Sequence, residues 1–241
     1  MGRAARVALI VAAALASLGF VALALWQIQR LGWKQDLIAR VDRQVNAAPV
    51  APPPPAAWAT IGKPDEYRRL RLHGRFEPRE VLVQATTELG GGHWVLAPLR
   101  LDDGTTVLVN RGFVPPEQRA PELHAAPAQP VELVGLLRLS EPGGGPLRHN
   151  APAEGRWYSR DVAGIAAQLA LAGPVVPFFV DESADPAQPR RWPRPGLTVL
   201  RFTNNHAVYA ATWLALAAMA AAAAGFLVRE ERRRHGTNAP S

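Results

Sequence analysis

The residues with the clearest capacity for chemistry lie near the C-terminal end of the chain, on one stripe of a predicted helix. His206 is followed by Tyr209 and Trp213, at the third and seventh positions after it, so the three side chains share one helix face. A neutral imidazole is a strong ligand for iron, and flat aromatic rings can wall a site for a flat macrocycle. The simpler interpretation, which the pattern alone favours, is an interfacial histidine followed by two aromatic membrane anchors.

No catalytic constellation is visible elsewhere in the sequence. A nucleophile elbow of the G-x-S-x-G type and a zinc helix of the H-E-x-x-H type are both missing, and the chain has no cysteine for a thiolate site or a disulfide. The acidic pairs Asp102-Asp103 and Asp181-Glu182 are predicted to lie in turns. The other histidines do not cluster by spacing and are interpreted as structural or exposed: His73, His93, His124 and His149. We therefore predict a binding protein and not an enzyme.

Two apolar runs determine how these residues are positioned. Residues 7–25 and 207–228 are almost free of polar side chains, over about 19 and about 22 residues. A helix rises about 1.5 Å per residue, so about 20 residues cross the hydrocarbon core of a bilayer. Alanine supplies half of the second run, and its small side chain suits close packing against another helix. The sequence predicts two transmembrane helices with one domain between them.

Basic residues at both ends of the chain predict its orientation. Arg3 and Arg6 precede the first run, and four arginines follow the second, at positions 229 and 232–234. Short basic tails stay in the cytoplasm, so the middle domain should lie outside it. The predicted divisions are a tail at 1–6, helices at 7–25 and 207–228, an external domain at 26–206, and a tail at 229–241. The alternative is a cleaved signal peptide ending near 22–24, but the first apolar run is longer than a typical signal core.

The net charge of +7 could suggest a nucleic-acid partner. The arginines are spread along the chain without a single basic stripe, and the last cluster is explained as a topology signal. With the middle domain outside the cytoplasm, we predict no nucleic-acid binding.

The first helix is expected to continue beyond the membrane, because apolar residues recur at three- and four-residue spacing as far as Val41. A proline-rich linker at about 49–55 should then end it as a stiff, extended spacer. Alternating apolar and polar residues predict the strands of the domain, at 70–76, 81–84, 93–101, 105–114, 131–139, 178–181 and 197–202. The glycine triplets at 90–92 and 143–145 are predicted to be loops.

One helix is expected within the domain, with Asp161 at its N-terminal cap and Gly173-Pro174 beyond its end. Mostly antiparallel strands with one helix predict an α+β fold, a small barrel or sandwich-like domain between two transmembrane helices. Gly112 interrupts one strand pattern, which indicates a bulge or the close approach of another backbone.

Four segments together resemble one known family. They occur in order over almost the whole chain: LWQIQRLGWKQDLI at 25–38, NRGFVP at 110–115, an N-x-P…W-Y-x-R-D pattern at 150–161, and NNHAVYAATW at 204–213. This combination resembles the Surfeit-locus family of cytochrome c oxidase assembly factors. The chain departs from the family pattern at Phe113, where a tryptophan is usual, at Gly155-Arg156, and at Ala207.

The resemblance implies a role in maturing a haem-copper oxidase, with haem a as the cofactor bound by bacterial members. His206 would be the iron ligand, with Tyr209 and Trp213 lining the site. The oxidase core subunit, the haem a synthesis machinery and membrane lipid are the implied partners, and the bacterial inner membrane with a periplasmic domain is the implied location. Further motif residues are expected to be structural: Trp26, Gln27, Arg30, Gly112, Trp157, Tyr158, Arg160 and Asp161. The alternative function is a structural membrane chaperone that holds an assembly intermediate without binding haem.

Overall fold

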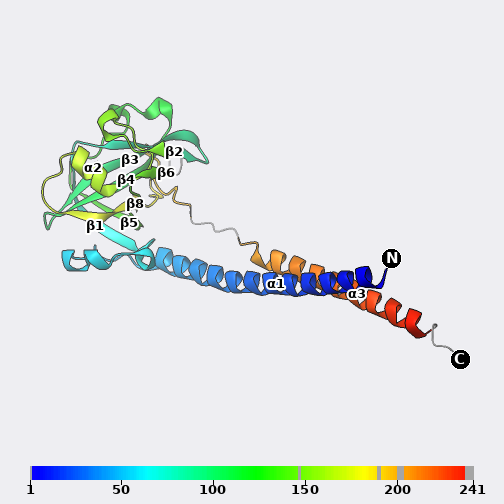
Figure 1. The fold of residues 1–241 in the computed structure, drawn as a ribbon. Helices are drawn as coiled ribbons and strands as arrows, with labels where there is room; N and C mark the ends of the chain where they lie inside the picture. Colours follow the sequence, from blue (N-terminus) through cyan, green and yellow to red (C-terminus); the bar gives the residue numbers. More distant parts are fainter. Residues whose placement is uncertain (1, 146–147, 189–190, 200–203, 237–241) are drawn as a thin grey trace. The chain divides into compact units, whose positions relative to one another are not determined.

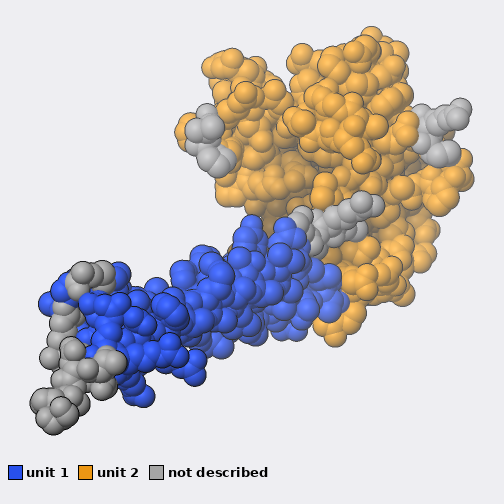
Figure 2. Space-filling view, turned by 90° about the vertical axis from the view of Figure 1, so that its right-hand side faces the viewer, with its two compact units in different colours: residues 1–40, 201–241 blue, residues 41–200 orange. Residues whose placement is uncertain are grey.

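The computed structural model describes residues 2–145, 148–188, 191–199 and 204–236. The chain forms two compact units, of which the first combines Met1–Arg40 with Arg201–Ser241 and the second is Val41–Leu200 (Figure 2). Each unit is described by itself.

The first unit consists of long apolar helices. Helix α1 (Arg3–Asn46) and helix α3 (His206–Gly236) contain the two segments of the described chain that are long and apolar enough to cross a membrane, Ala4–Asn46 and His206–Arg234 (Figure 1). The prediction of two apolar terminal helices is confirmed. Helix α1 also continues past the first apolar run, as its residue spacing predicted, and ends before the prolines.

Within this unit the two helices run antiparallel. Arg6 binds Glu231 at 2.9 Å, and the rings of Phe20 and Trp213 stack at 5.6 Å between centroids. Early residues of α1 therefore meet late residues of α3. The buried positions between the helices are mostly small side chains, which allow the close approach expected of membrane helix pairs: Ala24, Ala210 and Ala217.

The second unit is a small closed β barrel. Its strands are β1 (Arg69–Phe76), β2 (Val81–Thr87), β3 (Gly90–Leu101), β4 (Thr106–Val114), β5 (Val131–Leu139) and β8 (Val175–Glu182). The sheet order is β1-β5-β8-β4-β3-β2, and an additional pairing of β1 with β3 closes the ring (Figure 1). All pairings are antiparallel except that of β4 with β8. The predicted α+β class is confirmed.

Short elements complete the barrel unit. Strands β6 (Gly144–Gly145) and β7 (Arg148–His149) form a small hairpin, and helix α2 (Val162–Gln168) begins at the predicted Asp161 cap. Five 3₁₀ turns occupy proline-containing connections: η1 (Pro55–Thr60), η2 (Lys63–Asp65), η3 (Pro116–Gln118), η4 (Pro121–Leu123) and η5 (Pro152–Glu154). The proline-rich linker is attached to the barrel, because Val50 pairs with Leu70 of β1.

Two hydrophobic clusters hold the unit together. The first contains side chains from β1, β3, β4, β5 and β8, including Leu72, Leu99, Val109, Leu137 and Phe178. The second joins β2, β3, β4 and β8 to helix α2, and it includes Trp157 and Ile165. Because alternate residues of β4 contribute to different clusters, that strand is buried along its whole length.

Three predictions, about the two glycine triplets and the last strand, were wrong. The triplet at 143–145 was expected to be a loop, but Gly144 and Gly145 form β6 and pair with β7. A side chain on Gly144 would lie 2.3 Å from the carbonyl oxygen of Arg148, so glycine allows this close pairing. The triplet at 90–92 belongs to β3, where a side chain on Gly92 would lie 2.3 Å from the carbonyl oxygen of Val114, so glycine serves packing there.

The predicted strand at 197–202 is not formed over 197–199, and 200–202 lie outside the described residues. The pairing in this region instead occurs earlier, where Arg194 exchanges backbone hydrogen bonds with Phe113, and Val199 is largely exposed.

Candidate functional site

His206 stands at the first residue of α3 and is fixed by one partner from α1. Its Nδ1 atom lies 2.6 Å from Oε1 of Gln27, whose side chain is buried, with the residue only 8% exposed. A carbonyl oxygen can only accept a hydrogen bond, so Nδ1 is the donor in this contact. In the neutral ring this leaves the lone pair on Nε2. Both residues belong to the sequence motifs, but the sequence did not predict the hydrogen bond between them.

The second ring nitrogen of His206 is available for another partner. Within the described part of the chain no hydrogen bond reaches Nε2, and the residue is half-buried. Histidines that bind metals usually donate their other N–H to an oxygen acceptor, which fixes the ring and its tautomer. The His206–Gln27 arrangement therefore fits one axial ligand of a haem iron.

The two aromatic residues of the predicted stripe have different surroundings. Trp213 stacks against Phe20 in the helix pair, whereas Tyr209 is 53% exposed. His206, Tyr209 and Trp213 all lie on α3 as predicted, but the hydrogen-bond partner of His206 is a glutamine of α1. Of the nearby motif residues, Trp26 is exposed and the Arg30 guanidinium lies 4.8 Å from the ring centroid of Trp33.

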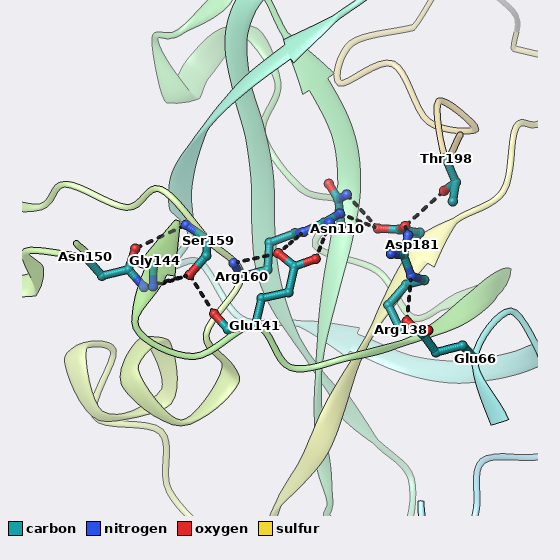
Figure 3. A network of polar contacts seen from close by, with 10 residues as sticks. All are labelled: Glu66, Asn110, Arg138, Glu141, Gly144, Asn150, Ser159, Arg160, Asp181 and Thr198. Carbon is teal, nitrogen blue, oxygen red and sulfur yellow. Dashed lines mark hydrogen bonds and ion pairs between the residues drawn. The ribbon is translucent and has the colours of Figure 1, made fainter. Parts of the chain in front are cut away.

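A second polar centre lies in the barrel, around Asp181 at the end of β8 (Figure 3). Asp181 is 4% exposed, and its Oδ1 accepts a hydrogen bond of 2.7 Å from Asn110. Its Oδ2 accepts bonds from Arg138 at 3.1 Å and from Thr198 at 2.9 Å. Both carboxylate oxygens are thus occupied, so this group is suited to holding strands together and has no free capacity for a ligand.

Arg160 extends the same network towards β5 and α2. Its guanidinium donates to Glu141 at 2.6 and 3.1 Å and lies 3.5 Å from Asp181 (Figure 3). Burial alone would raise the pKa of Glu141, but the hydrogen bonds and charge of Arg160 outweigh it, and this pKa is lowered. The negative charge of Glu141 is therefore stabilised by the fold.

The motif residues at 150–161 each have a structural role. The Asn150 side chain accepts hydrogen bonds from the backbone N–H groups of Tyr158 and Ser159, at 2.8 and 3.1 Å. Trp157 is buried beside α2 and donates its indole N–H to Gln168, while Asp161 caps α2 by accepting from the N–H of Gly164. These contacts connect the segment to α2 and to its own backbone within the barrel unit.

The Asn-Arg-Gly motif of β4 is structural for the same reason. Asn110 uses both ends of its amide, donating to Asp181 and accepting from the N–H of Gly112 at 3.2 Å. Arg111 is buried and donates to the carbonyl oxygens of His124 and Ala125. Gly112 has φ of +126°, and a side chain there would lie 2.2 Å from the carbonyl oxygen of Arg194. The close backbone approach that its position predicted is confirmed.

The interpretation of Asp181-Glu182 as a turn was wrong. Both residues belong to β8, and burial raises the pKa of Glu182 although Arg191 and Arg111 oppose the shift. Local sequence could not predict these contacts, because the partners of Asp181 are 43 and 71 residues away in sequence, at Arg138 and Asn110.

Three of the remaining histidines, at 73, 124 and 149, agree with their interpretation as structural or exposed. His93 does not, because it is half-buried and its Nδ1 atom has no hydrogen-bond partner among the described residues. His73 is exposed beside Asp102, while His124 is buried and bonded to the Gln118 carbonyl oxygen and to Glu80. In the part of the chain that the structure describes, no group of three or more histidine, aspartate or glutamate side chains could hold a metal ion.

Comparisons with a family model and with known proteins identify the same family. The model of the SURF1 family matches residues 14–218. A SURF1-like protein from Monosiga brevicollis is 33% identical over 231 residues, covering 89% of this chain and 85% of the relative. Surfeit locus protein 1 from Rattus norvegicus is 33% identical over 212 residues, and that from Homo sapiens is 32% identical over 215; both alignments cover 80% of this chain, and 67% and 68% of the relatives.

Proposed function

Because the chain belongs to the SURF1 family, known as cytochrome oxidase assembly factors, we propose that it binds haem a and assists its insertion into the core subunit of a haem-copper cytochrome c oxidase. The observation that carries this proposal is the His206–Gln27 pair, which holds an imidazole with its Nε2 lone pair unused. The protein would act by binding and would catalyse no reaction.

Each residue of the pair has a distinct role in this proposal. His206 would hold the haem iron through a ring nitrogen, and the Gln27 carbonyl oxygen would keep Nδ1 protonated and the ring in one orientation. Haem, when bound, supplies the iron and the flat macrocycle that the oxidase later uses. The exposed Tyr209 and the stacked pair of Trp213 and Phe20 offer aromatic surface on the same helices.

We also propose that the barrel is periplasmic and that the helices span a bacterial inner membrane with both termini in the cytoplasm. The antiparallel helices support it, because the Arg6–Glu231 ion pair joins the beginning of α1 to the later part of α3. The basic residues beyond each apolar run support the same orientation. Reporter fusions at Gly143 and at the C-terminus should report opposite sides, and equal external activity of both would contradict the proposal.

The test of the function is the haem content of purified protein co-expressed with the enzymes of haem a synthesis. His206→Ala should lose most of the bound haem, while its circular dichroism and thermal unfolding stay those of the unmutated protein. His73→Ala is the matched control, since that exposed histidine lies in the barrel unit. Equal haem occupancy and unchanged spectra in both variants would contradict the role of His206 as the iron ligand, and purified proteins that all lack haem would favour the structural chaperone that works without haem.

The proposed partners can be tested on the same preparations. Purification of the tagged full chain should recover the oxidase core subunit, and His206→Ala should reduce haem transfer without preventing that association. A variant that loses both haem and the core subunit would contradict the separate role given to His206.

A further inference from the structure

The barrel carries a hollow that the motifs and the proposed function leave without a role. It has a volume of about 250 Å³ and is open to the surface. Side chains from β2 and β3 form one part of its wall, and the segment that contains Tyr158 forms another. The lining residues are Leu82, Gln84, His93, Arg119, Gly155, Arg156, Trp157 and Tyr158.

Positive charge is concentrated around this hollow. Among the described residues the exposed guanidinium of Arg119 has no carboxylate partner, whereas Arg156 is paired with Glu154. Arg148 stands beside the lining residues, donating to Gln84 at 2.8 Å and lying 5.4 Å from the ring centroid of Tyr158. Of these three arginines, Arg156 is the one for which the described residues provide a carboxylate partner, Glu154.

His93 gives a second, independent indication of an anionic ligand. Its Nδ1 atom is buried and has no hydrogen-bond partner within the described chain, although the ring lines the hollow. Burial and the charge of Arg119 both lower the pKa of His93. A histidine with a lowered pKa and an unbonded Nδ1, beside the unpaired Arg119, is an environment that an added negative charge would stabilise.

We propose that this hollow binds an oxyanion group, a carboxylate or a phosphate, with Arg119 as the principal charged contact and His93 and Arg156 beside it. The volume is below the range of about 300–1,000 Å³ that is typical of pockets for drug-sized ligands. The site therefore suits a small anion, or the charged end of a larger molecule whose body stays outside. The indole of Trp157 and the ring of Tyr158 provide apolar wall on one side.

The experiment uses the full chain in detergent micelles with isotope-labelled histidine. Sodium phosphate and sodium acetate are titrated separately at pH 7, each against sodium chloride at matched ionic strength. The His93 ring signals, assigned with a His93→Gln variant, should shift saturably, and the pKa of His93 should rise when the anion is bound. The arm with the stronger saturation identifies the preferred oxyanion.

Two arginine variants with the same change in net charge decide the outcome. Arg119→Gln should weaken anion binding about tenfold or more, as expected when a charge-assisted hydrogen bond is lost. Arg71→Gln, at an exposed pair with Glu132 on the barrel surface, should leave the affinity unchanged. Equal affinities in these variants would overturn the proposal, as would signals that follow ionic strength alone. Thermal unfolding of both variants verifies that they are folded.

Discussion

The helix pair and the barrel bury polar groups in opposite ways. Between α1 and α3, Gln27 meets His206 through a single hydrogen bond, and the second imidazole nitrogen has no partner among the described residues. In the barrel, Asp181 receives hydrogen bonds on both carboxylate oxygens from three different segments. From this contrast we infer that the Asp181 network serves the fold, whereas the second nitrogen of His206 keeps bonding capacity for the ligand proposed above.

The energetic consequences of the two arrangements also differ. Removing one member of a buried charged network leaves the remaining charges without compensation, which costs several kcal/mol. Removing a neutral hydrogen bond between membrane helices costs on average only about 0.6 kcal/mol. Changes in the Asp181 network should therefore affect folding, and changes to the His206–Gln27 pair should affect ligand binding.

The largest effect is expected for Gly112→Glu in the barrel. The backbone φ of +126° is strained for any side chain, and a Cβ would lie 2.2 Å from the Arg194 carbonyl oxygen. We expect a loss of at least about 4 kcal/mol in the free energy of unfolding, measured by denaturant titration and limited proteolysis.

The matched control for this change is Gly91→Glu. Gly91 also lies in a strand, but it is exposed, and no atom lies within 4 Å of the point that a Cβ would occupy there. The control should remain folded. If Gly112→Glu resisted proteolysis as well as Gly91→Glu does, the backbone contact with Arg194 would not be essential to the barrel.

The next largest effect is expected for Asp181→Asn. The substitution keeps the shape but removes the charge that faces Arg138 and Arg160. Because Glu66 and Glu141 still face these arginines, we expect a loss of about 3 kcal/mol, the lower end of the range for broken buried pairs. Glu132→Gln, which breaks an exposed pair with Arg71, should cost less than about 1 kcal/mol. Equal losses would show that the network around Asp181 is no stronger than a surface pair.

The sequence predicted the features that depend on neighbouring residues, and it missed those that depend on residues far apart in the chain. The apolar runs, the Asp161 cap and the close approach at Gly112 follow from local pattern, and each is found in the structure. The barrel closure by β1 and β3 and the buried Asp181 depend on residues far apart in the chain, which periodicity does not record. The Gln27 contact of His206 was missed for the same reason, since 179 residues separate the two.

At the helix pair, the informative change is Gln27→Leu. It removes the hydrogen-bond partner of His206 and replaces it with an apolar side chain of similar size. Loss of the acceptor frees the ring to rotate and to change tautomer, so haem affinity should fall about 10- to 100-fold, the usual effect of losing such a supporting contact. Haem titration by absorbance measures it, with Gln29→Leu on the same helix as control. A variant that unfolds while retaining haem affinity would reverse the roles given to the two regions.

The smallest effect is a difference in acid sensitivity between two glutamates of the barrel. Arg160 holds the folded-state pKa of Glu141 below its ordinary value, although burial opposes this. The ionised Glu141 side chain therefore stabilises the fold above about pH 4.3, and this stabilisation is lost as the pH falls through the folded-state pKa. The folded-state pKa of Glu182 is raised, chiefly by burial, so protonation of this residue favours the folded state as the pH falls. Glu141→Gln should therefore flatten the decline of the melting temperature below about pH 4.3, and Glu182→Gln should steepen the decline above that pH. Parallel pH profiles for the two variants would mean that these carboxylates have equivalent environments, contrary to the contacts that distinguish them.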